Sequence, residues 1–146
     1  MRHIRTSARA IIRSEDAMLV VRYRDDRGNF YALPGGGQRP GEELSSAVVR
    51  EVAEETGLQV HVGPLRFVRE CLAGPGSRAL PADFHQVEFY FTCEILGQTP
   101  MAPALDPGQD GVEWCTVAQL RDRCFFPMAL LDAISDDQKF GYLGVV

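Results

Sequence analysis

Five glutamates lie close together near the middle of this 146-residue sequence. Three of them, Glu51, Glu54 and Glu55, are spaced as i, i+3 and i+4. In a helix this spacing places the carboxylates on one face, where they repel one another unless something positive lies among them. Oxygen ligands from two helical turns suit a hard cation that keeps several waters, such as Mg²⁺ or Mn²⁺. The spacing therefore predicts a divalent-metal site on a helix.

The segment Glu42–Thr56 has the spacing and the residues of an amphipathic helix, and Gly57 suits the left-handed residue that ends one. Its apolar side comprises Leu44, Ala47, Val48 and Val52. On a helical wheel the three glutamates fall on that same side, whereas a solvated acidic face would lie opposite it. Arg50 flanks the cluster and can reach back to Glu42 or forward to Glu54. We therefore expect an inward-facing acidic cluster.

A glycine-rich stretch, Pro34–Gly41, comes directly before this helix. Its glycines and prolines predict a loop that is neither helix nor strand interior. Such a backbone can approach the helix and offer carbonyls to a metal or amides to a phosphate, although a tight turn needs the same glycines. No Gly-Lys-Ser/Thr follows, and Pro40 stands where a dinucleotide-binding fingerprint begun at Gly35 requires glycine.

Loop and helix together resemble the Nudix box, G-x5-E-x7-R-E-U-x-E-E-x-G-U, in which U is a bulky aliphatic residue. Every fixed position is matched by Gly36, Glu42 and the run Arg50-Glu51-Val52-Ala53-Glu54-Glu55-Thr56-Gly57-Leu58. The resemblance implies an α/β protein with the Nudix fold, a mixed β-sheet sandwiched between α-helices with a loop–helix–loop metal site. It also implies hydrolysis of a nucleoside diphosphate linked to another moiety, by attack of water on phosphorus.

The resemblance also implies roles for single residues. The implied metal ligands are Glu51, Glu54, Glu55 and the backbone carbonyl of Gly35. Arg50 resembles the residue that orients the box carboxylates, and Glu42 its partner at the start of the helix. The implied cofactor is Mg²⁺, which Mn²⁺ can replace, and Glu54 or Glu55 is near enough to take the proton of the attacking water.

Residues outside the box are candidates for supporting roles. An additional base or ligand can come from Glu88, Asp106, Asp110 or Glu113. Asp110 is preferred, because it lies in a stretch expected to be a flexible loop. Arg22 and Arg24 end a predicted strand and can clamp phosphate oxygens, although solvated arginines on an edge strand are an equal alternative. Tyr23, Phe30 and Tyr31 can stack on a base or fill the core.

The remaining pattern predicts one α/β domain over residues 1–146. Ala8–Ile12 and Ala17–Tyr23 are predicted to form an antiparallel hairpin, followed by a short strand at Phe30–Leu33. Further strands are predicted at residues 59–62, 65–71, 85–95 and 112–115, and loops at residues 73–83 and 97–111. Two last helices are predicted, one capped by Thr116 and ending near Arg121, the other across Phe125–Ile134.

Composition narrows the function classes. Fifteen basic and 20 acidic residues give a net charge of −5, which argues against non-specific binding of duplex nucleic acid. Lys139 is the only lysine, which disfavours Schiff-base and P-loop chemistry. The sequence lacks an apolar stretch near 18 residues and a signal-peptide pattern, so we expect a cytoplasmic protein without a membrane span. Cys93 and Cys115 are expected to be buried thiols.

Two functions fit these observations. The first is a Mg²⁺-dependent hydrolase of a small nucleotide, with a nucleoside triphosphate as the first candidate and a nucleotide sugar such as ADP-ribose as the second. The alternative is a non-catalytic nucleotide-binding or regulatory domain on the same fold, which we would expect to have lost box carboxylates. All of them are present, which favours the enzyme. The sequence does not determine the oligomeric state, and a homodimer is compatible with it.

Overall fold

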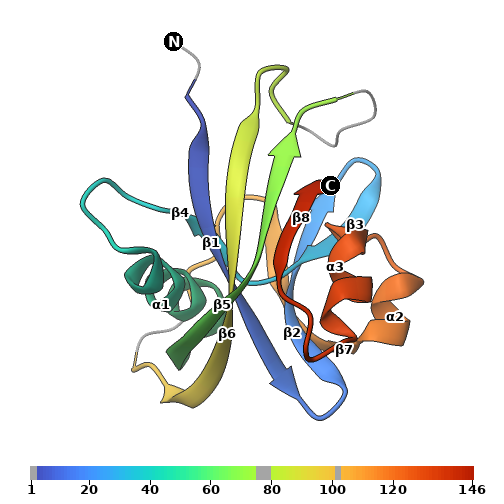
Figure 1. Ribbon diagram of the computed structural model, residues 1–146. Coiled ribbons are helices and arrows are strands. Elements are labelled where there is room, and N and C mark those ends of the chain that lie inside the picture. Colours follow the sequence, from blue (N-terminus) through green and yellow to red (C-terminus); the bar gives the residue numbers. More distant parts are fainter. Residues whose placement is uncertain (1–2, 75–79, 101–102) are drawn as a thin grey trace.

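The computed structural model describes residues 3–74, 80–100 and 103–146 (Figure 1). In chain order its elements are β1 (Arg5–Ser14), β2 (Ala17–Asp25), β3 (Gly28–Ala32), β4 (Gly35–Gly37), α1 (Leu44–Thr56), β5 (Leu58–Leu72), β6 (His85–Gln98), β7 (Gln109–Thr116), α2 (Val117–Arg121), α3 (Met128–Ile134) and β8 (Gly141–Val145). Within these residues the strands form an eight-stranded sheet of order β3-β2-β1-β6-β5-β8, in which β4 pairs with β1 and β7 with β2. The sheet is mixed, because β1 runs parallel to β6 and β5 parallel to β8.

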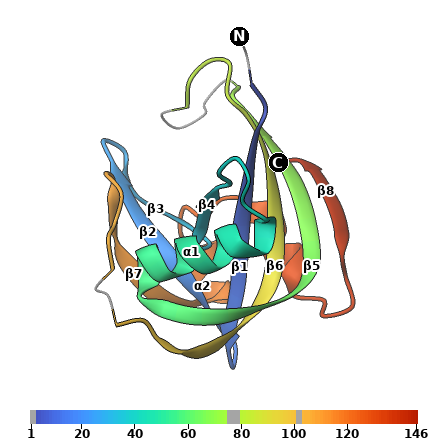
Figure 2. The ribbon, with the colours of Figure 1, turned by 90° about the vertical axis from the view of Figure 1, so that its left-hand side faces the viewer.

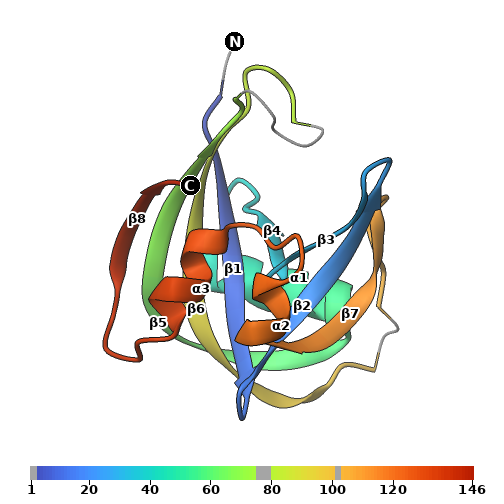
Figure 3. The same ribbon diagram turned by 90° about the vertical axis from the view of Figure 1, so that its right-hand side faces the viewer.

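Helix α1 and the pair α2–α3 cover opposite faces of the sheet (Figures 2 and 3). Strand β1 shows how the sequence produces this layering, since alternate side chains of a strand point to opposite faces. Ala10 and Ile12 belong to the core under α1, whereas Ile11 belongs to the core that includes α2 and α3. The predicted fold, a mixed sheet between helices, is confirmed.

The predicted helix begins two residues later than expected and ends where expected. Ala47, Val48 and Val52 are fully buried in the core between α1 and the sheet. Gly57 is left-handed, with φ of 72°, and its N–H donates to the carbonyl of Ala53 at 3.0 Å. Apolar periodicity and a glycine stop signal were therefore sufficient to place α1.

The prediction that Pro34–Gly41 contains no strand is wrong. Gly35–Gly37 forms β4, which pairs antiparallel with residues 7–9 of β1. A Cβ atom on Gly35 would lie 2.2 Å from the carbonyl oxygen of Ala8, so only glycine lets the two backbones come this close. Glycine content predicted an irregular loop, but here it permits strand pairing.

Other boundaries also differ from prediction. The two strands predicted at residues 59–62 and 65–71 are one strand, β5, whose register shifts between Val62 and Leu65. The predicted hairpin is present, but only two residue pairs join β1 to β2 before they separate toward β6 and β7. Thr116 caps α2 as expected. The helix predicted across Phe125–Ile134 begins three residues later, at Met128, because Pro127 is extended and comes directly before α3 instead of lying in its first turn. Strand β8 was not predicted.

The two predicted loops are only partly described. Residues 75–79 of the first and 101–102 of the second lie outside the described residues. The second loop is shorter than predicted, because β6 extends to Gln98 and β7 begins at Gln109. In the described part of the chain, no helix has both the length and the apolarity to span a bilayer. Cys93 and Cys115 are buried, as predicted.

Candidate functional site

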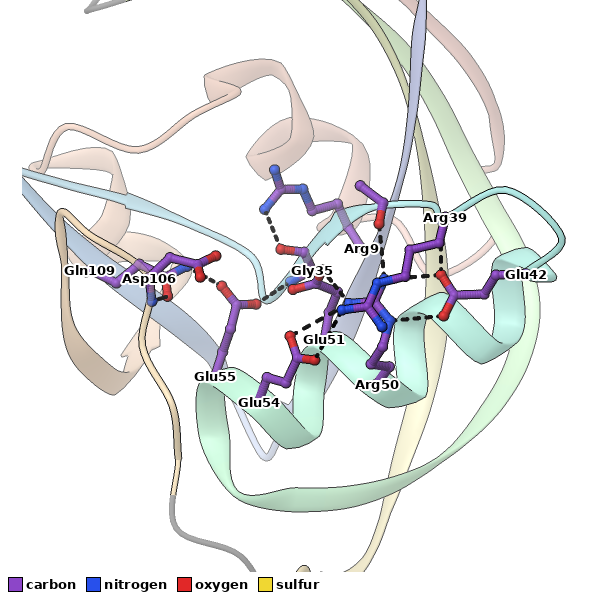
Figure 4. Close-up of polar contacts among 11 residues, drawn as sticks. Arg9, Gly35, Arg39, Glu42, Arg50, Glu51, Glu54, Glu55, Asp106 and Gln109 are labelled. Atoms are coloured by element: carbon purple, nitrogen blue, oxygen red, sulfur yellow. Dashed lines mark hydrogen bonds and ion pairs between the residues drawn. The ribbon is translucent and has the colours of Figure 1, made fainter.

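Helix α1 directs its three glutamates toward the glycine strand β4 (Figure 4). Glu51 and Glu55 are only 9% and 3% exposed, respectively, whereas the side chain of Glu54 is 41% exposed. The wheel therefore placed Glu51 and Glu55 correctly on the inward side, and Glu54 lies at the rim. Of the three carboxylates, that of Glu54 is therefore the most accessible to solvent.

Arg50 connects the acidic cluster to both ends of the preceding loop. Its guanidinium donates to Glu42 at 2.8 and 2.9 Å, to Glu51 at 2.8 Å and to the carbonyl of Gly37 at 3.0 Å. Glu54 lies 3.5 Å from the same guanidinium. Hydrogen bonds from Arg50 hold the pKa of Glu42 at about 2, although partial burial acts the other way. Arg50 therefore makes the contacts with Glu42 and Glu54 that its position on the wheel allowed.

The glycine strand lies directly against the carboxylates. A Cβ atom on Gly36 would stand 2.6 Å from the carboxyl carbon of Glu51. The N–H of Gly35 donates to Glu55 Oε1 at 2.7 Å. A side chain at Gly36 would collide with Glu51, so glycine in β4 is needed for the close packing of β4 against the glutamates of α1.

Glu55 is a buried acid with an unfavourable environment for its charge. Burial raises the pKa of Glu55 to about 7, and the nearby Glu51 carboxylate adds to this effect. The charge of Arg9 and hydrogen bonds from Gly35 and Gln109 lower the pKa but do not cancel the effect of burial. The site therefore gathers negative groups where water cannot fully solvate them.

The donor set has the chemistry of a hard-cation site. Three carboxylates and the Gly35 carbonyl are oxygen donors, the kind of group that Mg²⁺ takes as ligands in proteins. Among the described residues, no three His, Cys, Asp or Glu side chains already converge on one point. Arg50 lies among the carboxylates instead, and Arg9 Nη1 donates to the Gly35 carbonyl at 3.2 Å. The oxygen donors are therefore of the type that such a cation binds, and in this structure guanidinium groups of Arg9 and Arg50 contact them instead.

Arg9 stands where two cavities meet. One, of about 470 Å³, lies beside β4 and the acidic cluster, and the other, of about 390 Å³, is mainly apolar. Arg9 and Tyr23 line both of them. The ring of Tyr23 stacks on Phe30 with centroids 5.0 Å apart, and Phe126 meets Phe30 edge-on. The two cavities therefore share a wall that carries a guanidinium and an aromatic ring.

Glu88, one of the four acids outside the box, forms an ion pair with Arg9. Its carboxylate accepts hydrogen bonds from Arg9 at 3.3 Å, Arg69 at 2.6 Å, Gln86 at 2.8 Å and Tyr90 at 2.5 Å. Burial alone would raise the pKa of Glu88, but the charges of Arg9 and Arg69 outweigh it and hold the pKa at about 2. Such a saturated, weakly basic carboxylate is a buried counter-ion, not a general base.

The structure does not bring the predicted phosphate clamp to the cluster. Arg22 donates to Asp110 at 3.2 Å and to Glu113, while Arg24 is exposed. Strand alternation is the reason, since Tyr23 between them faces the cavities. Among the described residues that line the two cavities, neither Arg22 nor Arg24 is present.

Among the acids outside the box, the preferred Asp110 is not at the cluster either. Its carboxylate pairs with Arg22, and Glu113 pairs with Arg22 and with Arg123 at 2.8 Å. Asp106 is the one of the four that lines the cavity beside the cluster. The loop before β7 therefore reaches the site, but through residues other than Asp110.

Three residues that the sequence did not single out reach this cavity. Gln109 donates to Glu55 from 54 positions away, and Arg5 and Arg9 extend from β1 toward the glycine strand. A Cβ atom on Gly37 would lie 2.7 Å from the Arg5 guanidinium. The i, i+4 spacing of Arg5 and Arg9 places both on one face of a strand, but only the pairing of β1 with β4 shows which face.

Comparisons with known proteins agree with this geometry. Nucleoside triphosphatase NudI from Escherichia coli is 42% identical over 59 residues, which is 38% of this chain and 42% of that protein. Mouse nucleoside diphosphate-linked moiety X motif 6 is 33% identical over 78 residues, which is 53% of this chain and 23% of that protein. The match therefore spans less than half the length of each relative.

Likeness of fold extends further than likeness of sequence. A NUDIX hydrolase from Nitrosomonas europaea superposes with a TM-score of 0.78 at 21% identity, covering 97% of this chain and 94% of that one. The family model described as NUDIX domain matches residues 1–134, from before β1 through the end of α3. With the box, the sheet and the family model in agreement, this chain belongs to the NUDIX family.

Proposed function

We propose that this protein is a divalent-metal-dependent pyrophosphohydrolase that acts on a nucleoside diphosphate linked to another moiety. The observation that carries the proposal is the packing of Glu51 and Glu55 against the glycine strand, with Glu54 at the rim of the adjoining cavity. Oxygen donors gathered beside a polar cavity suit a cation that a diphosphate would share.

The proposed ligands are the Gly35 carbonyl and the carboxylates of Glu51, Glu54 and Glu55. When bound, Mg²⁺ would neutralise charge on the pyrophosphate oxygens and activate water. Arg50 holds the cluster to Glu42 and to Gly37, so it orients the carboxylates before substrate arrives. Arg5 and Arg39 line the same cavity and are placed to hold phosphate oxygens.

The reaction is attack of water on phosphorus, which forms one P–O bond and breaks the bridging P–O bond. The water proton goes to a box carboxylate. Glu54 suits this role better than Glu55, because both oxygens of Glu55 accept hydrogen bonds, from Gly35 and from Gln109. Glu54 instead lies at the rim with its side chain 41% exposed.

The cavities favour a small nucleotide as substrate. The anionic part would lie beside Arg5, Arg9 and Arg39, and the planar part would lie against Tyr23 and Phe30. A nucleoside triphosphate is the first candidate, in line with the activity in the name of the NudI relative, and a nucleotide sugar is the second.

The test is a substrate screen of the purified protein with Mg²⁺ or Mn²⁺. The panel contains nucleoside triphosphates, ADP-ribose and dinucleoside polyphosphates, with release of phosphate, pyrophosphate or nucleoside monophosphate as the signal. We expect metal-dependent turnover of at least one compound and a loss of about 100-fold or more in Glu55→Gln, because this variant removes one of the proposed metal ligands. The matched control, Glu94→Gln, changes an exposed glutamate on β6 and should keep the wild-type rate.

Equal, metal-independent rates in the wild type and in Glu55→Gln would overturn the hydrolase. Nucleotide binding without turnover at saturating Mg²⁺ or Mn²⁺ would instead favour the non-catalytic binding domain. Isothermal calorimetry with the same panel separates these two outcomes.

A further inference from the structure

The loop before β7 enters the site through an amide side chain. Gln109 Nε2 donates to Glu55 Oε2 (Figure 4). The same nitrogen donates to the Tyr23 hydroxyl at 3.2 Å. Its Oε1 accepts from the backbone N–H of Asp106 at 2.9 Å, which fixes the orientation of the amide. The Gln109 side chain therefore links three parts of the chain through hydrogen bonds, namely its own loop, β2 and α1.

Gln109 completes the support of one buried carboxylate. Glu55 Oε1 is held by the N–H of Gly35 at 2.7 Å, and Oε2 is held by Gln109. The two donors approach from different elements, β4 and the start of β7. Because a carboxylate held at both oxygens has little freedom to rotate, this pair of contacts fixes the plane of the Glu55 carboxylate.

The segment that carries Gln109 is itself anchored on both sides. The N–H of Arg24 donates to Gly108 at 2.8 Å, and the N–H of Ala104 donates to the carbonyl of Glu54 at 2.6 Å. Asp106 and Pro107, in the same segment, line the cavity beside the cluster. A ligand in that cavity would therefore touch the segment that positions Glu55.

We propose that Gln109 is a positioning residue for Glu55, and that it sets both metal affinity and turnover at this site. The inference rests on the proposed hydrolase and extends it beyond the box. An amide suits the role, because it donates a hydrogen bond at every working pH and adds no negative charge to an acidic cluster. The neighbouring Asp110 cannot replace it, since that carboxylate pairs with Arg22.

The experiment compares Gln109→Ala and Tyr23→Phe with Gln138→Ala, which changes an exposed glutamine outside the site. Tyr23→Phe removes one partner of Gln109 and leaves Glu55 untouched. Two measurements are made: Mn²⁺ affinity without nucleotide, from the electron paramagnetic resonance of free Mn²⁺, and kcat and KM on the best substrate of the screen.

Loss of a residue that supports a metal ligand typically costs about 10–100-fold in metal affinity or activity. We expect Gln109→Ala to weaken Mn²⁺ binding and to lower kcat within this range, with KM changing less than kcat. Tyr23→Phe should move in the same direction by a smaller factor, and Gln138→Ala should match the wild type.

Wild-type Mn²⁺ affinity and kcat in a folded Gln109→Ala protein would overturn the positioning role. If Gln109→Ala does not fold, Tyr23→Phe is the deciding variant. Wild-type Mn²⁺ affinity and kcat in Tyr23→Phe would also contradict the positioning role of Gln109. A wild type that hydrolyses nothing would overturn the proposed function, and the Mn²⁺ comparison would still decide the role of Gln109.

Discussion

At the scale of single residues, Glu88 is a buried carboxylate for which the structure predicts a role in stability and not in chemistry. It is buried with Arg9 and Arg69, the side chains of which are 14% and 8% exposed. Replacing it by glutamine keeps the shape but leaves two buried guanidinium groups without their shared counter-ion. We expect Glu88→Gln to lower the free energy of unfolding by about 3–5 kcal/mol, measured by urea denaturation.

The control for this prediction is Glu94→Gln, on an exposed position of the same strand. A surface change of this kind should stay within about 0.5 kcal/mol of the wild type. Equal stability of Glu88→Gln and Glu94→Gln would mean that the ion cluster under Arg9 adds nothing to the fold.

The same carboxylate predicts a pH dependence with a defined sign. The pKa of Glu88 is lowered from 4.5 to about 2, because Arg9 and Arg69 outweigh the opposing effect of burial. A depressed carboxylate pKa contributes stability above the unfolded pKa and loses that contribution as pH falls through the folded pKa. The stability difference between wild type and Glu88→Gln should therefore hold from pH 7 to about pH 5 and shrink toward pH 3. A difference that is constant over this range would contradict the assignment.

Residue identities in the box were predictable because they depend on short-range spacing. Glu51 and Glu55 share a helix with Arg50, so a wheel places them. Gln109 is 54 positions from Glu55, and nothing local marks it. Arg22 and Arg24 show the opposite difficulty, since they were selected by their place in the sequence and strand alternation turned them away from the cavity.

At the scale of elements, the approach of β4 to α1 is the feature on which the site depends. Gly36→Ala would place a methyl group 2.6 Å from the carboxyl carbon of Glu51. Overpacking typically costs about 1–3 kcal/mol of stability. Displacement of a catalytic group by about 1 Å costs about 100-fold in rate. We therefore expect a folded protein with a rate lower by about 100-fold, measured with the best substrate of the screen.

Gly97→Ala is the matched control, because a Cβ atom there meets nothing within 4 Å. It should leave both the rate and the unfolding free energy near their wild-type values. A Gly36→Ala protein as active as Gly97→Ala would show that the close approach of the two elements is not needed.

Elements were predictable to the extent that their signals are local. Apolar spacing and Gly57 located α1, and Thr116 as a capping residue located α2. Strand β4 was missed because its residues are glycines, which carry no pattern, and because its partner is β1, far away in sequence. Strand β8 was missed because it is short and pairs only at the sheet edge, with β5.

At the scale of the whole molecule, the fold changes what the charge balance of the sequence implied. Residues Gly36–Leu58 hold five acidic and two basic residues, a net charge of −3 out of −5. From its charge alone, this segment is expected to repel phosphates in the absence of a metal. The fold adds Arg5 and Arg9 from β1 to the cavity, in which Arg39 and Arg50 also lie. We also propose that residues 1–146 form a single domain, for which we expect one cooperative unfolding transition.

The last prediction concerns the order in which metal and nucleotide bind. Arg50 and Arg9 are held by Glu42, Glu51 and Glu88. In metal-free protein the exposed Arg5 and Arg39 are therefore the cavity arginines that can meet a phosphate, and Arg39 must first leave Glu54, which lies 3.9 Å away. Chelation should then weaken the binding of a non-hydrolysable nucleotide analogue by roughly tenfold or more, or 1.4 kcal/mol, in isothermal calorimetry. The double variant Glu54→Gln/Glu55→Gln should show a smaller difference in affinity between chelator and Mg²⁺ than the wild type, because it lacks two of the four proposed ligands. Arg39→Gln should lose more affinity in chelator than in Mg²⁺. Equal wild-type affinity under both conditions would mean that the arginines, and not a metal, hold the phosphates.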